Sequence, residues 1–190
     1  MKLSPASLAL IAALLASGPA TAADYVIDTD KAHASINFRI KHLGFSWLTG
    51  RFDKFSGTFS FDPDKPETSK VKVVVDTDSV NSNHAERDKH LRGKEFLDTA
   101  NFPTATFEST SVKLDGDRAT ITGNLTLHGV TKEITIGATR VGGGDDPWGG
   151  HRDGFSGTTS LPLKDFGINY NLGPAAQEVE LALEIEGVRQ

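Results

Sequence analysis

Residues 178–186 read EVELALEIE, and this segment decides the fold class. Val179, Leu181, Leu183 and Ile185 alternate with glutamates at positions 178, 180, 184 and 186. A period of two places the aliphatic side chains on one face of a strand and the carboxylates on the other. The segment therefore predicts a β-strand with one apolar and one solvated face, as is typical of antiparallel sheets.

The same alternation recurs along the chain. Apolar residues share a face in four further segments: Ile36, Phe38 and Ile40; Val71, Val73 and Val75; Ile121, Gly123, Leu125 and Leu127; and Ile134, Ile136 and Ala138. Turn signals separate such segments, at 62–64, 115–117, 128–129 and in a loop over 142–150. The pattern predicts an all-β fold of about eight strands, an antiparallel sheet closed into a β-barrel.

An immunoglobulin-like sandwich is the structural alternative, because it would produce the same alternation. It does not readily explain a short polar helix, which the sequence predicts near residues 84–92. Asn83 can cap that helix, Glu86 follows three residues later as in a capping box, and Gly93 is placed to end it. Neither helix face is apolar, so amphipathic packing does not account for it. We expect the helix to cap, cover or line something.

The first residues predict a secretory signal peptide over 1–22. Lys2 precedes an apolar run, 8–16, that is too short to span a bilayer, and Ala20-Thr21-Ala22 is a cleavage signal. The remaining residues, 23–190, are expected to form one domain without a stable membrane anchor. The chain has no cysteine, which excludes disulfides. Its formal net charge of −5 argues against nucleic acid or an anionic membrane surface as the main partner.

Seven motifs occur in order between Asp24 and the C-terminus: HLGFSWLTGRF, NHAERDKHLR, EFLDTANFPTATFEST, ITGNLTLHGVTKEI, GDDPWGG, GFSGTTSLPLKDFGI and LGPAAQEVELALEIEGV. Together they resemble the YceI family of secreted bacterial proteins. The resemblance implies a lipocalin-like antiparallel barrel that binds a polyisoprenoid or other long-chain, fatty amphiphile in an internal pore. It also implies a periplasmic location. A homodimer is compatible with it, although no strand marks an interface.

Aromatic side chains gather at turns and strand ends, where the mouth of a barrel would lie. From the residues alone, a packed core and a ligand wall explain them equally well. The resemblance favours the ligand wall, for which the candidates are Phe38, Phe45, Trp47, Phe52, Phe59, Phe96, Phe107 and Phe155.

A polar head group would need partners near one mouth of the barrel. The candidates are His42, Asn83, His84, Arg87 and Asp88, together with the neighbouring Leu91. Arg87 is the natural partner of an anionic head group. The alternative is a solvated helix with an Asp88–Arg92 pair.

Motifs for catalysis and metal binding are missing. His84 and His90 are six residues apart, whereas a zinc-binding helix places two histidines four apart. There is no Gly-x-Ser-x-Gly elbow, phosphate loop or dinucleotide fingerprint. We therefore expect no catalytic residue, cofactor or metal. Two alternatives stay open: an amphiphile hydrolase or isomerase using His42 or His84, and a protein-interaction module with a packed barrel and a functional loop at 142–150.

Overall fold

The computed structural model describes residues 22–190, which form one eleven-stranded sheet and one α-helix. The strands are β1 (Ala23–Ile27), β2 (Ser35–His42), β3 (Ser46–Phe52), β4 (Phe55–Phe61), β5 (Lys70–Asp76), β6 (Val80–Asn81), β7 (Thr104–Asp115), β8 (Arg118–Leu127), β9 (Val130–Asp145), β10 (His151–Pro162) and β11 (Glu178–Arg189). The helix is α1 (Ala85–Arg92), and three short 3₁₀ turns are η1 (Pro66–Thr68), η2 (Thr77–Ser79) and η3 (Leu163–Phe166).

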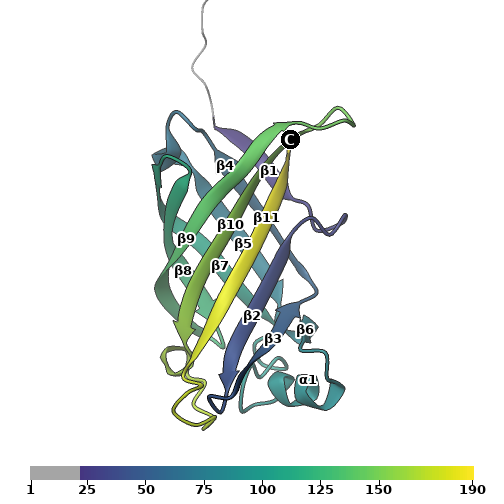
Figure 1. The fold of residues 1–190 in the computed structure, drawn as a ribbon, viewed down its shortest axis with the longest axis vertical. Helices are drawn as coiled ribbons and strands as arrows, with labels where there is room; N and C mark the ends of the chain where they lie inside the picture. Colours follow the sequence, from purple (N-terminus) through teal and green to yellow (C-terminus); the bar gives the residue numbers. More distant parts are fainter. Residues whose placement is uncertain (1–21) are drawn as a thin grey trace, which may run out of the picture.

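The sheet closes on itself. Its strand order is β1-β4-β5-β7-β8-β9-β10-β11-β2-β3-β6, and β1 also pairs with β11 (Figure 1). The closing antiparallel pairs are Tyr25 with Arg189, Val26 with Val188 and Ile27 with Gly187. This closure confirms the predicted antiparallel barrel and excludes the two-sheet sandwich, whose sheets stay separate.

One edge of β11 is shared by two strands that follow each other in the chain. Val179–Glu184 pairs with β2, whereas the last three pairs of β11 are made with β1. Strands β4 and β3 pair with β1 and β2 in the same way, as do β5 and β6 with β4 and β3. Each of these couples occupies the place of one long, broken strand. The wall therefore counts eight positions, as the sequence predicts.

The two ends of the barrel differ in what covers them (Figure 1). We call the end with residues 62–69, 115–117 and 146–150 the upper end. The lower end holds the β2–β3 turn, α1 with residues 93–103, the β8–β9 turn and residues 163–177. The predicted helix is thus confirmed, and it lies beside β3 and β6 at the lower end.

The cap of α1 differs from the prediction. His84, not Asn83, is the N-cap, and its Nδ1 accepts a hydrogen bond from the Arg87 N–H at 3.2 Å. Asn83 has a φ of 62°, in the left-handed region, which is incompatible with the extended backbone of an N-cap. Gly93 ends the helix as predicted, and its N–H donates to the His90 carbonyl at 2.9 Å.

The expected loop over 142–150 is shorter than predicted. Gly142, Gly143 and Gly144 pair with β10, so that the strands continue to Asp145 and His151. Only glycine fits at position 143, because the side chains of Arg140 and Asp153 fill the space where its Cβ would lie. A register shift between Gly154 and Phe155 accommodates the irregular pairing.

Inside the barrel, aromatic rings lie against glycines of other strands. A Cβ added to the glycine would lie 2.6–2.8 Å from a ring carbon in three pairs: Gly50 with Phe38, Gly123 with Phe107, and Gly187 with Phe59. Because glycine has no side chain, the ring of a phenylalanine on another strand can occupy the space beside it. The interior of a narrow barrel is filled without strain in this way.

Replacing Gly187 with alanine tests this packing. The new Cβ would lie 2.6 Å from Phe59 Cζ and 2.9 Å from Tyr25 Cβ. We expect the free energy of unfolding in urea to fall by about 1–3 kcal/mol, as in other overpacked cores. Gly137→Ala is the matched control, because no atom lies within 4 Å of its Cβ position. An equal loss in both variants would contradict the packing argument.

Candidate functional site

A narrow cavity runs inside the barrel. Its volume is about 160 Å³, and its wall is formed mainly by inward side chains of β4, β5 and β7–β11. Val73, Ile121, Ile134 and Leu183 point inward, yet they are only half-buried. Their uncovered surface faces the cavity, so this part of the barrel is hollow rather than fully packed.

The cavity is long for its volume. Its wall includes Ala119 and Leu125, six residues apart on β8, a distance of about 20 Å along a strand. Since barrel strands are tilted by roughly 40°, this corresponds to about 15 Å along the barrel axis. A small volume spread over this length has the shape of a channel for an extended chain. We call it the internal channel.

The wall of the internal channel is apolar. None of its lining residues carries an ionisable side chain, and the few hydroxyl groups come from Ser60, Ser69, Thr106 and Thr159. The Ser69 Oγ is buried without a hydrogen-bond partner among the described residues. A buried hydroxyl without a hydrogen bond lowers the free energy of unfolding by about 1–3 kcal/mol. The channel is therefore suited to hydrocarbon and offers no general acid or base.

The upper end of the channel is closed. Tyr25 stacks on Phe59 with ring centroids 4.7 Å apart, and Phe155 meets the edges of Phe59 and Phe61 at 5.7 and 5.3 Å. Tyr25, Phe59 and Phe61 are all buried. Aromatic pairs in these geometries add stabilisation beyond the area they bury.

A buried ion pair lies over this aromatic cluster. Asp153 is buried and accepts two hydrogen bonds from the Arg140 guanidinium, at 2.9 Å from Nε and 2.8 Å from Nη2. Arg140 also lies 5.4 Å from the centre of the Phe61 ring. The hydrogen bonds to Asp153 raise the pKa of Arg140, whereas burial and the nearby Asp153 charge raise the pKa of Tyr25. Arg140 thus stays charged and Tyr25 stays neutral at neutral pH, which favours the ion pair at the closed end.

The lower end is closed on one side only. Leu161 of β10 is buried, as is Phe166 of η3, which packs against β9 and β10. On the opposite side, Phe38 of β2 and Phe52 of β3 are half-buried, with ring centroids 5.9 Å apart. The inward faces of β2 and β3 therefore leave apolar surface accessible at the lower end.

The predicted aromatic residues fall into several groups. Phe59, Phe107 and Phe155 line the internal channel, while Phe38 and Phe52 continue the apolar surface below it. The others lie elsewhere: Phe45 and Trp47 are exposed on the β2–β3 hairpin, and Phe96 is buried against His90 and Tyr170.

The predicted polar residues do not gather at the internal channel. His42 is exposed at the end of β2, and Asn83 and His84 are exposed before α1. Leu91 is half-buried on α1. None of the residues from Asn83 to Leu91 lines the channel.

Arg87 and Asp88 both bind the segment before the helix. The Arg87 guanidinium donates to the Ser82 Oγ at 2.7 Å and to its carbonyl at 2.6 Å. Asp88 is buried and accepts from both the Ser82 N–H, at 2.7 Å, and the Ser82 hydroxyl. Arg92 donates to the Asp78 and Val80 carbonyls. These contacts explain how a helix without an apolar face is held.

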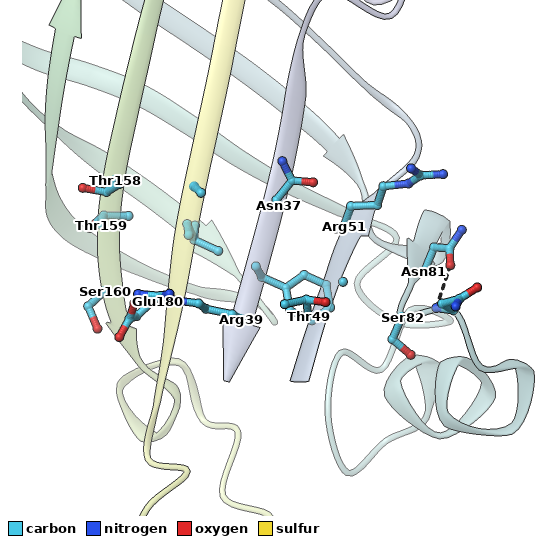
Figure 2. Close-up of a pocket in the computed structure, with 15 residues that line it drawn as sticks. Asn37, Arg39, Thr49, Arg51, Asn81, Ser82, Thr158, Thr159, Ser160 and Glu180 are labelled. Atoms are coloured by element: carbon cyan, nitrogen blue, oxygen red, sulfur yellow. Dashed lines mark hydrogen bonds and ion pairs between the residues drawn. The ribbon is translucent and has the colours of Figure 1, made fainter. Parts of the chain in front are cut away.

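A larger, open groove lies on the outer face of β10, β11, β2, β3 and β6 (Figure 2). Its volume is about 820 Å³. The outward side chains there are polar, and Arg39 forms an ion pair with Glu180 at 2.6 Å. Figure 2 shows Asn37, Thr49, Arg51, Asn81, Thr158 and Ser160 in two rows across these strands. The lining also includes Phe38, Leu181 and Ala182, so the groove combines polar and apolar groups, whereas the wall of the internal channel is apolar.

One group among the described residues has the composition of a metal site. Possible ligand atoms of Asp28, His33 and Glu186 lie within 4.8 Å of one another. Arg152 Nη1 donates to Asp28 at 2.7 Å and to Glu186 at 2.5 Å, so a guanidinium already neutralises these carboxylates. The hydrogen bond from Arg152 lowers the pKa of Asp28. The arrangement is explained as an ion-pair network on the outer wall.

The family model for the YceI-like domain matches residues 25–187. The chain belongs to the YceI family. A UPF0312 protein of Pseudomonas aeruginosa is 61% identical over 190 residues, with 100% of both chains covered. Protein YceI of Salmonella arizonae is 56% identical over 190 residues, also with 100% of both covered. The family resemblance of the motifs is thereby confirmed.

Solved structures of YceI-like proteins have the same fold. The YCEI protein of Campylobacter jejuni matches with a TM-score of 0.72 and 30% identity, covering 80% of this chain and 90% of that one. A polyisoprenoid binding domain from Saccharophagus degradans matches with a TM-score of 0.64, covering 90% of this chain and 100% of that domain. Its sequence identity is 18%, so this match concerns the fold alone.

No helix within residues 22–190 is both long and apolar enough to cross a membrane. The predicted signal peptide, residues 1–22, lies outside the described residues except for Ala22.

Replacing Asp88 with alanine tests how α1 is held. We expect the free energy of unfolding to fall by about 1.5–3 kcal/mol, because the change leaves the buried Ser82 N–H without its charged partner. Glu86→Ala, on the exposed face of the same helix, should change it by less than about 0.5 kcal/mol. Urea unfolding near pH 7 measures both.

The same variant should show a defined pH dependence. Burial alone would raise the pKa of Asp88, but the hydrogen bonds from Ser82 outweigh it and lower the pKa below its ordinary value. A lowered pKa gives stability that is present above about pH 4, the unfolded value, and is lost as the pH falls below it. The difference between wild type and Asp88→Ala should therefore shrink near pH 3. A difference that stays constant would remove the charge from the explanation.

Proposed function

We propose that this protein is a non-catalytic, periplasmic lipid-binding protein that holds a polyisoprenoid or similar long-chain amphiphile inside the barrel. Sequestration, transport or storage of that molecule would be its role. The observation that carries the proposal is the internal channel, which is long, narrow and lined by residues without an ionisable group. The predicted signal peptide supports export, and the similar fold of the polyisoprenoid binding domain from Saccharophagus degradans supports the ligand class.

Simple magnitudes agree with this ligand. An extended isoprene unit is about 4–5 Å long, so about three units fit along the channel axis. Each unit could contribute roughly 3–4 kcal/mol of gross apolar transfer energy. Association and chain ordering offset much of this gain. Useful affinity therefore requires the chain to fill the channel, and the remaining units of a longer chain would lie outside it.

The proposed contacts follow from the placement of the side chains. Phe59, Phe107 and Phe155 would contact the part of the chain inside the channel, and Phe38 and Phe52 the part below it. Because the upper end is closed by the aromatic cluster and the Arg140–Asp153 pair, the polar head would lie at the lower end. Of the residues predicted to meet the head group, His42, Asn83 and His84 are exposed at this end.

Native mass spectrometry tests the proposal. The protein is purified from its own host without detergent, and is then measured intact and after extraction with organic solvent. A stoichiometric amphiphile with five-carbon repeats is the expected result. A mass without ligand, unchanged after incubation with isoprenoid quinones, would refute the proposal.

Filling the channel should remove binding without unfolding the barrel. Ile121 points into the channel, so we expect Ile121→Trp to weaken isoprenoid quinone binding at least tenfold, because the added ring occupies the space of the chain. Thr120→Trp, one residue away and facing outward, is the matched control and should bind as wild type. Binding is measured by the quenching of protein fluorescence or by native mass spectrometry. Equal affinity of both variants would place the ligand outside the channel.

A further inference from the structure

The turn between β2 and β3 exposes apolar side chains at the lower end. Phe45 is 85% exposed and Leu43 is 57% exposed, the highest values among the large apolar residues of this end. Trp47, on the same hairpin, is 42% exposed. Single exposed apolar residues are common on protein surfaces, but three on one turn mark an interaction site.

The apex of this turn has an unfavourable backbone. Leu43 has a φ of 52° and Gly44 a φ of 81°, and the Phe45 N–H donates to the His42 carbonyl at 2.9 Å. This is the left-handed geometry of a tight hairpin turn, in which asparagine, aspartate or glycine is preferred at the position of Leu43. More than half of the Leu43 side chain is exposed, so packing gives little to offset this backbone cost. Backbone strain held at an exposed side chain points to a function of that side chain.

A second uncharged segment lies against the turn. Residues 166–177 read FGINYNLGPAAQ and contain no ionised side chain. A Cβ on Gly173 would lie 3.8 Å from Leu43 Cδ2, and one on Gly44 would lie 3.7 Å from Ala175 Cβ, so the two segments are in contact. Tyr170 of this segment is 43% exposed. The two segments form an uncharged tip at the lower end, which we call the apolar tip (42–47 and 166–177).

The upper end has the opposite character. Its loops, 62–69, 115–117 and 146–150, contain one lysine, Lys65, and no arginine, against these acidic residues: Asp62, Asp64, Glu67, Asp115, Asp117 and Asp146. Of these, Asp146 is paired with Arg152 of β10 at 2.8 Å. Elsewhere at the lower end, α1 and residues 93–103 carry charges of both signs. An anionic surface would therefore repel the upper end and accept the lower one.

Trp47 lies where the apolar tip meets the barrel wall. The Arg39 guanidinium carbon is 4.4 Å and the Lys41 Nζ 5.5 Å from the centre of its ring. Trp and Tyr rings with neighbouring cations are typical of the level of lipid head groups, where one side is apolar and the other wet.

We propose that the apolar tip docks on a phospholipid bilayer, with Leu43 and Phe45 inserted below the head groups and Trp47 at their level. The inference builds on the proposed function, because a lipid carrier must exchange its ligand with a membrane. It places that exchange at the lower end, where the apolar surface of β2 and β3 is accessible. Docking would be reversible, since only a few side chains enter the bilayer.

Co-sedimentation with vesicles tests the docking without any isoprenoid. The vesicles contain phosphatidylethanolamine and phosphatidylglycerol in equal parts. Wild type should pellet with them, and Leu43→Ser combined with Phe45→Ser should lower the apparent affinity at least tenfold. The matched control is Val141→Ser combined with Trp148→Ser, which removes two exposed apolar residues from the acidic end and should pellet as wild type.

Two further measurements separate insertion from a loss of structure. In a Trp148→Phe background, Trp47 is the single tryptophan, and its emission should shift to shorter wavelength on vesicles and be quenched by brominated lipid. Leu43→Asn should raise the urea midpoint, because asparagine tolerates the left-handed backbone, and yet weaken docking. A higher urea midpoint together with weaker docking would support a role of Leu43 in docking rather than in stability.

Several results would overturn the docking proposal. One is a wild type that does not pellet, and another is an equal loss in the control at the acidic end. A third is dimerisation in sedimentation velocity that Leu43→Ser with Phe45→Ser abolishes, since the tip would then bind a second copy. Failure of the proposed function would look different: the protein would still pellet on bare vesicles, but it would retain no isoprenoid in solution.

Discussion

Strand β11 is the constraint on which the rest of the structure depends. One of its edges is covered by β10, and the other is shared between β2 below and β1 above. Strand β1 completes the ring over three residue pairs at the upper half of the wall. There the interior is closed and tightly packed around Tyr25 and Phe59. The lower half of the wall is formed on this side by β2, β3 and β6. There the polar helix α1 and the β2–β3 hairpin cover the end of the barrel.

This division explains why one barrel is both packed and hollow. Near β1, rings and an ion pair fill the interior, and Gly187 leaves the space that Phe59 needs. Farther from β1, the inward side chains are mostly aliphatic and leave part of their surface uncovered. The interior of an eight-stranded ring is just wide enough for side chains to fill, so a narrow space remains along the axis where those side chains are aliphatic. Its lack of charge follows from the period of two, which sends the glutamates of β11 outward.

Much of the fold could be predicted from the sequence, because alternation and turn residues report local structure directly. Val179–Ile185 and the valines of β5 lie in strands as predicted, and Phe59, Phe107 and Phe155 line the channel. The break between β1 and β2 and the contact of Phe59 with Gly187 both depend on residues far apart in the sequence. A local sequence pattern cannot predict them. Asp88 was misleading for a related reason: its charge suggests solvent, whereas Ser82, six residues earlier, binds it in a buried position.

The pairing of β11 also has a consequence for how the chain folds. Tyr25 and Arg189 form one of the closing pairs, so the ring joins segments from opposite ends of the sequence. Since β11 is synthesised after every other strand, no earlier length of chain can complete the ring. Contacts of such long sequence separation are formed slowly, and sheet edges stay open until they form. Folding of the barrel is therefore expected to finish only after the last strand has been synthesised, and its sheet edges stay open until then.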